Sequence, residues 1–186
     1  MVSYYIPDRY TEGYGISYIG IDAAAEEGCT LIIALDCGIK ATAKVEYARH
    51  KGIDFIICDH HLPADELPQA VAVLDPKRND CHYPFDELSG CGVGFKLLQA
   101  FCMSRNIPLT ELYPFLDLVV VSIASDLVSI TGENRCLLYT SDAADDLPRV
   151  DLGGRRIIQK KKHKQYLDSA RSLVDLILSS NTYSTN

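Results

Sequence analysis

The chain has 186 residues, which is enough for one domain of ordinary size, and its 47% hydrophobic content is compatible with a soluble globular core. Residues 1–135 hold 10 Lys and Arg against 19 Asp and Glu, a net charge of −9. This acidity argues against nucleic-acid binding through a broad basic face, and it is compatible with clustered carboxylates whose charge a divalent cation offsets.

The N-terminal region begins with an apolar run followed by a segment of helical periodicity. Residues 2–6, VSYYI, are aromatic and apolar and stop at Pro7, which predicts a strand. Residues 13–28 have apolar positions spaced for a helix, with Gly28 as its C-terminal stop. The apolar positions of this helix are Ile16, Ile19, Ala23 and Ala24.

The next segments repeat a strand–helix–strand pattern. Residues 30–36, TLIIALD, form a continuous apolar run that predicts a strand buried on both faces. Residues 40–52 predict a helix that ends in cationic residues and a glycine. Residues 54–59 and 70–76 repeat the strand pattern. This order predicts parallel βαβ units, and therefore an α/β fold with a parallel Rossmann-like sheet flanked by helices on both faces.

The following region is predicted to be helical. Residues 77–89 are polar and contain a proline, which indicates a loop. Residues 93–104 have helical periodicity. Residues 110–125 also favour a helix over a strand, because Asp117 and Ser122 interrupt the pattern of a buried strand.

Two of the predicted strands end in side chains that can bind a metal. Asp36 follows one strand, and Asp59, His60 and His61 follow the next. Ligands bind outside the carboxyl ends of parallel strands, so both groups are expected at one edge of the sheet. A carboxylate and an imidazole together suit an ion such as Mn²⁺ or Zn²⁺. The alternative stays open, since a single aspartate at a strand end is more often a turn or capping residue.

Five segments in this order resemble a known family. CDHH at 58–61 and ALDCGI at 34–39 resemble the DHH phosphoesterase superfamily. Three flanking segments resemble its RecJ branch, whose members are single-strand-specific 5′→3′ DNA exonucleases. They are YYIPDRYTEGYGIS at 4–17, LSGCGVGFKL at 88–97 and LDLVVVSIASDLVSITGENR at 116–135.

The resemblance implies roles for individual residues of a metal centre. Asp36 matches an aspartate that bridges two metal ions, and His60 matches a direct ligand of one ion. Asp126 matches the aspartate that completes the shell of that ion. His61 would face the scissile phosphate, and Asp59 would support the ligands, so these two are the candidate catalytic residues. Asp126 could instead be only a turn residue at the end of a helix.

The candidate substrate-binding residues are implied in the same way. They are Arg9, Ser89, Gly90 and Gly92. The glycines could equally be close-packing residues rather than an anion-binding nest. Ser125 and Ser129 stand where the family usually has Ala and Pro, which puts the local backbone around Asp126 in question.

The function implied by the resemblance is metal-dependent hydrolysis of phosphodiester bonds in single-stranded DNA, in the context of DNA repair and recombination. Two Mn²⁺ or Mg²⁺ ions would act in the intact enzyme. The alternatives are a DHH phosphodiesterase of nanoRNA or cyclic dinucleotides, and a non-catalytic scaffold that keeps the fold. Seven cysteines without a CxxC pair suit a reducing compartment. We expect a cytoplasmic monomer without a membrane segment.

The resemblance covers residues 2–135 and ends there. We expect 1–135 to be a partial DHH domain that lacks the Asp-x-Asp first motif of the family, and the fragment to be inactive alone. Residues 136–186 would be a non-homologous tail, since 136–162 resemble a translated sequencing adapter. Residues 136–165 are expected to pack poorly. A genuine basic tail that binds nucleic acid is the alternative.

Overall fold

The computed structural model describes residues 2–145, and only the backbone of 140–145. The chain divides between Cys81 and His82 into two compact units, which are described separately below. Within the described part of the chain, no helix has the length and apolar character that a bilayer-spanning segment requires.

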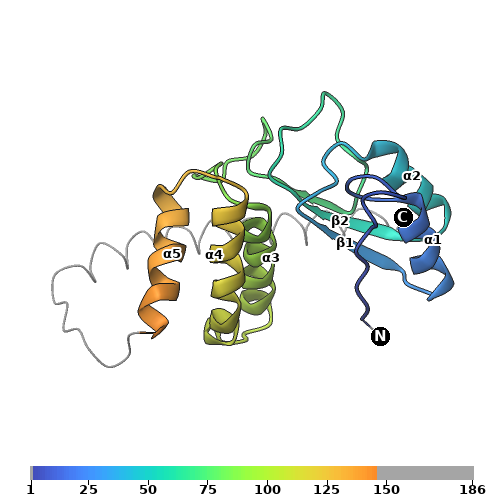
Figure 1. The fold of residues 1–186 in the computed structure, drawn as a ribbon. Helices are drawn as coiled ribbons and strands as arrows, with labels where there is room; N and C mark the ends of the chain where they lie inside the picture. Colours follow the sequence, from blue (N-terminus) through green and yellow to red (C-terminus); the bar gives the residue numbers. More distant parts are fainter. Residues whose placement is uncertain (1, 146–186) are drawn as a thin grey trace. The chain divides into compact units, whose positions relative to one another are not determined.

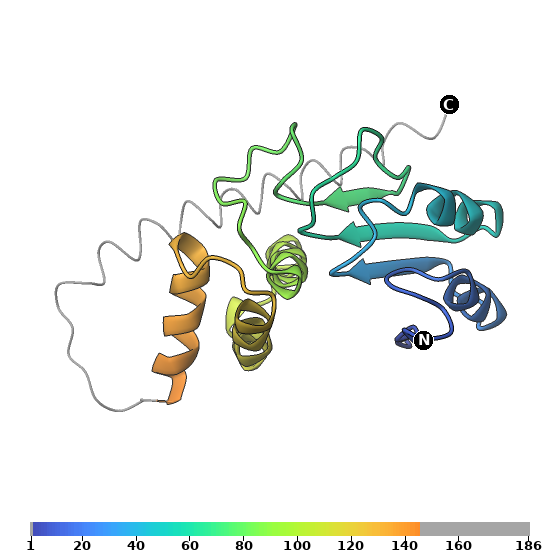
Figure 2. The same ribbon diagram turned by 45° about the horizontal axis from the view of Figure 1, so that its top comes forward.

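The first unit contains the predicted parallel sheet. Its strands are β1 (Leu31–Leu35), β2 (Asp54–Cys58) and β3 (Ala72–Leu74), in the order β1-β2-β3. Figure 2 shows the three arrows side by side and pointing the same way. The parallel α/β fold predicted from the sequence is therefore confirmed. All three strands consequently deliver the residues that follow them to one edge of the sheet.

Helices α1 (Tyr18–Glu26) and α2 (Thr42–His50) lie beside this sheet (Figure 1). Ile21 of α1 and Val45 and Ala48 of α2 form one buried cluster with Phe55 and Ile57 of β2. Because these side chains share a single cluster, both helices of this unit pack on the same face of the sheet. The prediction of helices on both faces is thus not met among residues 2–81.

Strand β1 differs from the prediction of burial on both faces. The side chains of Leu31, Ile33 and Leu35 are 44%, 48% and 55% exposed, whereas Ala34 between them is buried. Side chains alternate across a strand, so one face of β1 joins the core and the other remains open in the described structure. A continuous apolar run indicates that a strand is hydrophobic, but it does not determine whether both faces are covered.

The predicted strand at residues 2–6 is wrong. This segment has no regular secondary structure and no ladder of backbone hydrogen bonds with other described residues. Its side chains form hydrogen bonds instead: Ser3 Oγ donates to the Glu27 carboxylate at 2.7 Å, and Tyr5 OH donates to the Glu12 carboxylate at 2.8 Å. Aromatic composition indicates a strand only where a neighbouring backbone is available to pair with it.

Helix α1 lies within the range predicted for a helix, and two of the four apolar positions named there, Ile16 and Ala24, pack against the buried cluster of this unit. Ser17 caps its N-terminus by accepting a hydrogen bond from the N–H of Gly20 at 2.9 Å, and Gly28 follows its end at φ +72°. The one fully buried side chain of the helix is Ile21, whereas Ile19 is exposed.

The second unit is helical in its described part. It comprises α3 (Gly90–Ser104), the 3₁₀ helix η1 (Leu109–Phe115), α4 (Leu116–Ser125) and α5 (Gly132–Asp145). The predicted helices at 93–104 and 110–125 are confirmed, although the second one begins as a 3₁₀ helix. Its core is formed by seven buried side chains from all four helices: Phe95, Cys102, Leu112, Leu116, Val119, Ile123 and Leu137.

Helix α5 is attached to the rest of the second unit through its first two turns. Glu133 forms a buried ion pair with Lys96 of α3 and accepts a hydrogen bond from Tyr83 OH at 2.6 Å. Asn134 Nδ2 donates to the carbonyl oxygens of Glu87 and Ser129. The poor packing expected from residue 136 onward is not seen at Leu137, which is in the core.

The remainder of the expected tail, from residue 146 onward, lies outside the described residues. This includes most of the range for which poor packing was expected. The division into a DHH part and a non-homologous tail therefore stays a prediction.

Candidate metal centre

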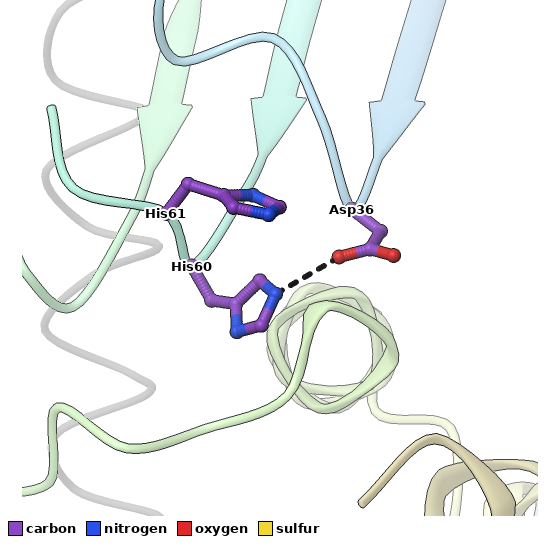
Figure 3. A group of neighbouring side chains, drawn as sticks. All are labelled: Asp36, His60 and His61. Atoms are coloured by element: carbon purple, nitrogen blue, oxygen red, sulfur yellow. Dashed lines mark ion pairs between the residues drawn. The ribbon is translucent and has the colours of Figure 1, made fainter. Parts of the chain in front are cut away.

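Three side chains of kinds that can bind a metal meet at the carboxyl edge of the sheet. Asp36 directly follows β1, and His60 and His61 follow β2 after one intervening residue, Asp59 (Figure 3). Asp36 Oδ1 lies 3.1 Å from His60 Nε2, and one ligand atom from each of the three residues lies within 4.8 Å of the others. The structure therefore brings together the residues that the strand-end argument placed at one edge.

The backbone at Asp36 is unusual and aims its side chain. The N–H of Asp36 donates to the carbonyl oxygen of Cys58 at 2.8 Å, which extends the pairing of β1 with β2 by one residue. Asp36 itself has φ +62°, in the left-handed region that Asn, Asp and Gly tolerate best. Gly38 follows at φ +113°, and a Cβ there would meet Ile16 at 3.0 Å. The sequence DCG thus suits the sharp turn that follows the strand.

Asp59 holds the turn after β2. Its carboxylate is 1% exposed and accepts hydrogen bonds from the N–H groups of Ile39, His60 and His61, at 2.8, 2.8 and 3.2 Å. His61 Nδ1 lies 2.6 Å from the same carboxylate. Burial raises the pKa of Asp59, but the hydrogen bonds from Ile39, His60 and His61 outweigh it and lower the pKa below the usual value. Asp59 therefore holds the backbone of both histidines and the ring of His61.

The two histidine rings have different environments. His60 is buried and directs Nε2 toward Asp36, whereas His61 is exposed and bound through Nδ1 to Asp59. The rings form an edge-on pair with centroids 4.6 Å apart. His60 is thus enclosed beside Asp36, and His61 is the more accessible of the two rings.

The donor set and its spacing fit a divalent cation. Two ligand atoms at about 2.1 Å from one ion are separated by roughly 3.0–3.4 Å at ordinary coordination angles. The 3.1 Å between Asp36 Oδ1 and His60 Nε2 lies in that range. Asp36 Oδ1 is buried and has no hydrogen bond of good geometry from any described residue. One carboxylate oxygen and imidazole nitrogens suit Mn²⁺ or Zn²⁺ better than Ca²⁺ or Mg²⁺.

Arg9 lies at a cavity that also reaches this site. The cavity has a volume of about 670 Å³, and its lining includes Arg9, Tyr14 and Asp36. The guanidinium carbon of Arg9 lies 5.4 Å from the centre of the Tyr14 ring, within the range of a cation–π contact. The Arg9 predicted to bind substrate and the Asp36 predicted to bind metal therefore border one hollow.

The other candidate residues gather in the second unit, at the N-terminus of α3. Ser89 is its buried N-cap and accepts a hydrogen bond from Gly92 N at 3.2 Å. Asp126, the C-cap of α4, accepts hydrogen bonds from Gly90 N at 3.3 Å and from Ser122 Oγ at 3.0 Å. Capping accounts for Ser89, and a Cβ at Gly92 would lie 3.3 Å from the Ser89 hydroxyl. Their substrate role, and the ligand role of Asp126, stay predictions.

One acidic residue near the site was overlooked in the sequence. Asp75 directly follows β3, so the rule that singled out Asp36 and Asp59 applies to it as well. It is buried, and Asp59 N donates to the carbonyl of the preceding Leu74 at 2.9 Å. The signal is the sequence LDP at the end of the third predicted strand, residues 70–76.

Comparison with known proteins agrees with this geometry. The sequence profile described as "DHH family, N-terminal domain" matches residues 1–123. The chain belongs to the DHH family. It is 39% identical over 147 residues to the single-stranded-DNA-specific exonuclease RecJ of Escherichia coli K12, a match that covers 74% of this chain and 26% of that protein. It is 43% identical over 136 residues to RecJ of Bacillus subtilis 168, covering 73% and 16%.

Solved structures show the same fold. A crystal structure of exonuclease RecJ bound to manganese matches with a TM-score of 0.64 and 23% identity, over 96% of this chain and 53% of that one. RecJ from Thermus thermophilus in complex with Mn²⁺ matches with a TM-score of 0.56 and 21% identity, over 87% and 29%. The resemblance to RecJ found in the sequence is confirmed. The chain spans about a quarter or less of the length of the two curated relatives described above.

Proposed function

We propose that this chain is the metal-binding part of a single-strand-specific DNA exonuclease that hydrolyses phosphodiester bonds. The observation that carries the proposal is the contact of Asp36 with His60, beside His61, at the sheet edge of a DHH-family domain. The similar RecJ proteins are described as single-stranded-DNA-specific exonucleases, and two solved relatives as bound to manganese. Mn²⁺ is accordingly the cation we propose for this site.

Each residue of the centre has a task that follows from its position. Asp36 and His60 hold the cation, which supplies charge neutralisation of the phosphate and a water of lowered pKa. Asp59 holds the backbone of both histidines and the ring of His61. Its carboxylate lies 2.6 Å from Nδ1 and fixes the His61 ring, which leaves Nε2 for contact with a phosphate oxygen as negative charge develops there. By family resemblance, Asp126 is a further ligand.

The cavity beside Asp36 is the proposed path of the DNA strand. Arg9 supplies a positive charge for a phosphate, and Tyr14, on which it lies, supplies a ring face for a base. A bound cation would offset part of the acidity of the chain, so that the phosphate backbone meets less repulsion than the net charge suggests.

The first prediction concerns metal binding. We expect the chain to bind Mn²⁺, and Asp36→Asn to weaken binding by at least about 100-fold, because it replaces an anionic ligand by a neutral one. Asparagine also tolerates the left-handed backbone of Asp36, so the fold should be retained. The measurement is titration of free Mn²⁺ by electron paramagnetic resonance, with circular dichroism to check folding.

A matched control and a second variant complete this titration. Asp65→Asn removes the same charge at an exposed position after β2 and should bind Mn²⁺ as the unmodified chain does. Asp126→Asn tests the ligand role implied by resemblance. If the unmodified chain binds no more Mn²⁺ than Asp36→Asn, the proposed metal centre is wrong.

The second prediction concerns turnover. Hydrolysis by two metal ions requires ligands for both, and the described residues contain a single cluster of three metal-binding groups. We therefore expect very low or no release of nucleotides from 5′-phosphorylated single-stranded DNA with Mn²⁺ when this chain is assayed alone. Turnover at the level of a full-length relative, assayed beside it, would show that this expectation of inactivity is wrong.

The same assay separates the alternative functions. Preferential cleavage of short RNA or of cyclic dinucleotides would favour another DHH phosphodiesterase over a DNA exonuclease. A scaffold protein would show neither cleavage nor Mn²⁺ binding, even when joined to the remaining domains of a relative. The conjunction of Asp36 with two histidines argues against a scaffold, which has no need for it.

A further inference from the structure

Residues 8–15 form a loop, the Arg9 loop, that the carboxylate of Glu12 holds closed. Three groups donate hydrogen bonds to this carboxylate: Asp8 N at 2.9 Å, Tyr5 OH at 2.8 Å, and Ser17 Oγ. Tyr5 precedes the loop and Ser17 follows it. Glu12 therefore joins the two ends of the loop through one side chain.

The rest of the Arg9 loop is ordered by local bonds. Asp8 Oδ1 accepts hydrogen bonds from Tyr10 N and Thr11 N, each at 2.9 Å. Gly13 and Gly15 have φ +84° and +78°, which lets the chain reverse its direction there. These features shape turns within the loop, but they do not connect it to the helices of the unit.

Glu12 makes that connection through Ser17. The Ser17 hydroxyl donates to Glu12 and accepts a hydrogen bond from Gly20 N, so it binds the loop and caps α1 at the same time. Ser17 is buried, and the carbonyl oxygen of the preceding Ile16 accepts a hydrogen bond from Lys44 of α2. The base of the loop is thus fixed to both helices that pack on the sheet.

The two side chains proposed above to meet the DNA strand are both part of this loop, one on each side of Glu12. Arg9 lies over the ring of Tyr14, with 5.4 Å between the guanidinium carbon and the ring centre. Both residues are exposed, so burial does not hold them in place. Their positions at the cavity depend on the backbone of the loop that carries them.

We propose that Glu12 is a positioning residue for single-stranded DNA, and that its carboxylate holds the Arg9 loop in the conformation that presents Arg9 and Tyr14 to the strand. Glu12 would touch neither the DNA nor the cation. A loop that is held in its bound conformation beforehand loses less entropy on binding, which raises the affinity. This inference rests on the DNA path proposed above.

The test is binding of a fluorescein-labelled single-stranded oligothymidylate in the presence of Mn²⁺, measured by fluorescence anisotropy with the 186-residue chain carrying Glu12→Gln. Glutamine preserves the shape of the side chain but offers one acceptor oxygen to three donors. We expect about 10-fold weaker DNA binding and an unchanged affinity for Mn²⁺. Loss of a negative charge by itself would strengthen DNA binding, so electrostatics predicts the opposite sign.

Two measurements separate positioning from a general effect on the fold. In a chain that carries Arg9→Ala, Glu12→Gln should cause a much smaller further loss of DNA binding, because both changes act on the same contact. Without metal, the Arg9 side-chain proton resonances, which the Tyr14 ring shifts, should move toward random-coil values in Glu12→Gln. Equal losses with and without Arg9 would show that Glu12 only supports the fold.

The matched control is Glu26→Gln, which removes the same charge from an exposed position at the end of α1 and should not weaken DNA binding. Tyr5→Phe removes one hydrogen bond to Glu12 and keeps the ring, so it should cause a smaller loss, and it carries the test if Glu12→Gln does not fold. Normal DNA binding by Glu12→Gln, or an equal loss in Glu26→Gln, would overturn the role of Glu12 and leave the DNA path intact. Absence of DNA binding by the unmodified chain would overturn the path, and this inference with it.

Discussion

Glu133→Gln should destabilise the second unit by about 3–5 kcal/mol, because it leaves the ammonium group of Lys96 buried without its carboxylate. Tyr83 also loses a charged acceptor for its hydroxyl group. Lys96→Met should have a similar effect, since it leaves Glu133 buried without its cation. Urea unfolding followed by circular dichroism at 222 nm measures the change, and hydrogen exchange of the α5 amides shows whether this helix is released first.

Two controls make the ion-pair prediction specific. The double variant Lys96→Met, Glu133→Leu should recover most of the loss, because replacing both partners removes the uncompensated charge. Glu46→Gln breaks the exposed pair of Glu46 with Arg49 and should leave stability unchanged. Equal effects of the buried and the exposed variants would contradict the argument that burial makes the Lys96–Glu133 pair important.

Asp59→Asn should destabilise the first unit by at least about 3 kcal/mol and abolish Mn²⁺ binding. The carboxylate accepts three backbone hydrogen bonds in addition to its contact with His61, and an amide offers only one acceptor oxygen for these donors. The turn that carries both histidines would lose its support. Urea unfolding without metal, together with Mn²⁺ titration, measures the two effects. Asp65→Asn serves as the exposed control.

The pH dependence provides an independent check on Asp59. Because its pKa is lowered in the folded state, the stabilisation is present above the unfolded pKa of about 3.8 and is lost as pH falls through the folded pKa. The unmodified chain should therefore lose stability below about pH 4 more steeply than Asp59→Asn does. Parallel acid profiles for the two proteins would show that Asp59 is not the buried, hydrogen-bonded carboxylate described above.

The sequence predicted the site better than it predicted its surroundings. Strand ends are strongly indicated by apolar runs, and parallel strands place their ends at one edge, so the proximity of Asp36 to the two histidines follows from the sequence pattern alone. The same rule applied to Asp75, but LDP also suits an ordinary turn. An ordinary turn aspartate is exposed, whereas Asp75 is buried. This burial depends on how other segments pack around the sheet, so the three residues LDP do not indicate it.

The two wrong predictions, a strand at residues 2–6 and burial of both faces of β1, have a common physical origin. Both depend on contacts with segments that are distant in the sequence. Residues 2–6 have strand-forming side chains but pair with no strand of the described chain, and β1 is apolar on both faces but covered on only one by the residues that the structure describes. Local composition reports what a segment could bury, whereas its actual burial depends on other segments. The ion pair of Lys96 with Glu133 could not be predicted from the sequence for the same reason, because its partners are 37 positions apart.

The left-handed backbone at Asp36 restricts how this centre could be redesigned for another ion. Replacing Asp36 by a cysteine, to favour a softer metal, would place a side chain that disfavours φ +62° at the end of β1, at a cost of about 1–2 kcal/mol before any coordination is gained. His60 has no such backbone restriction. Libraries aimed at altered metal selectivity should therefore vary the imidazole position and keep the carboxylate one.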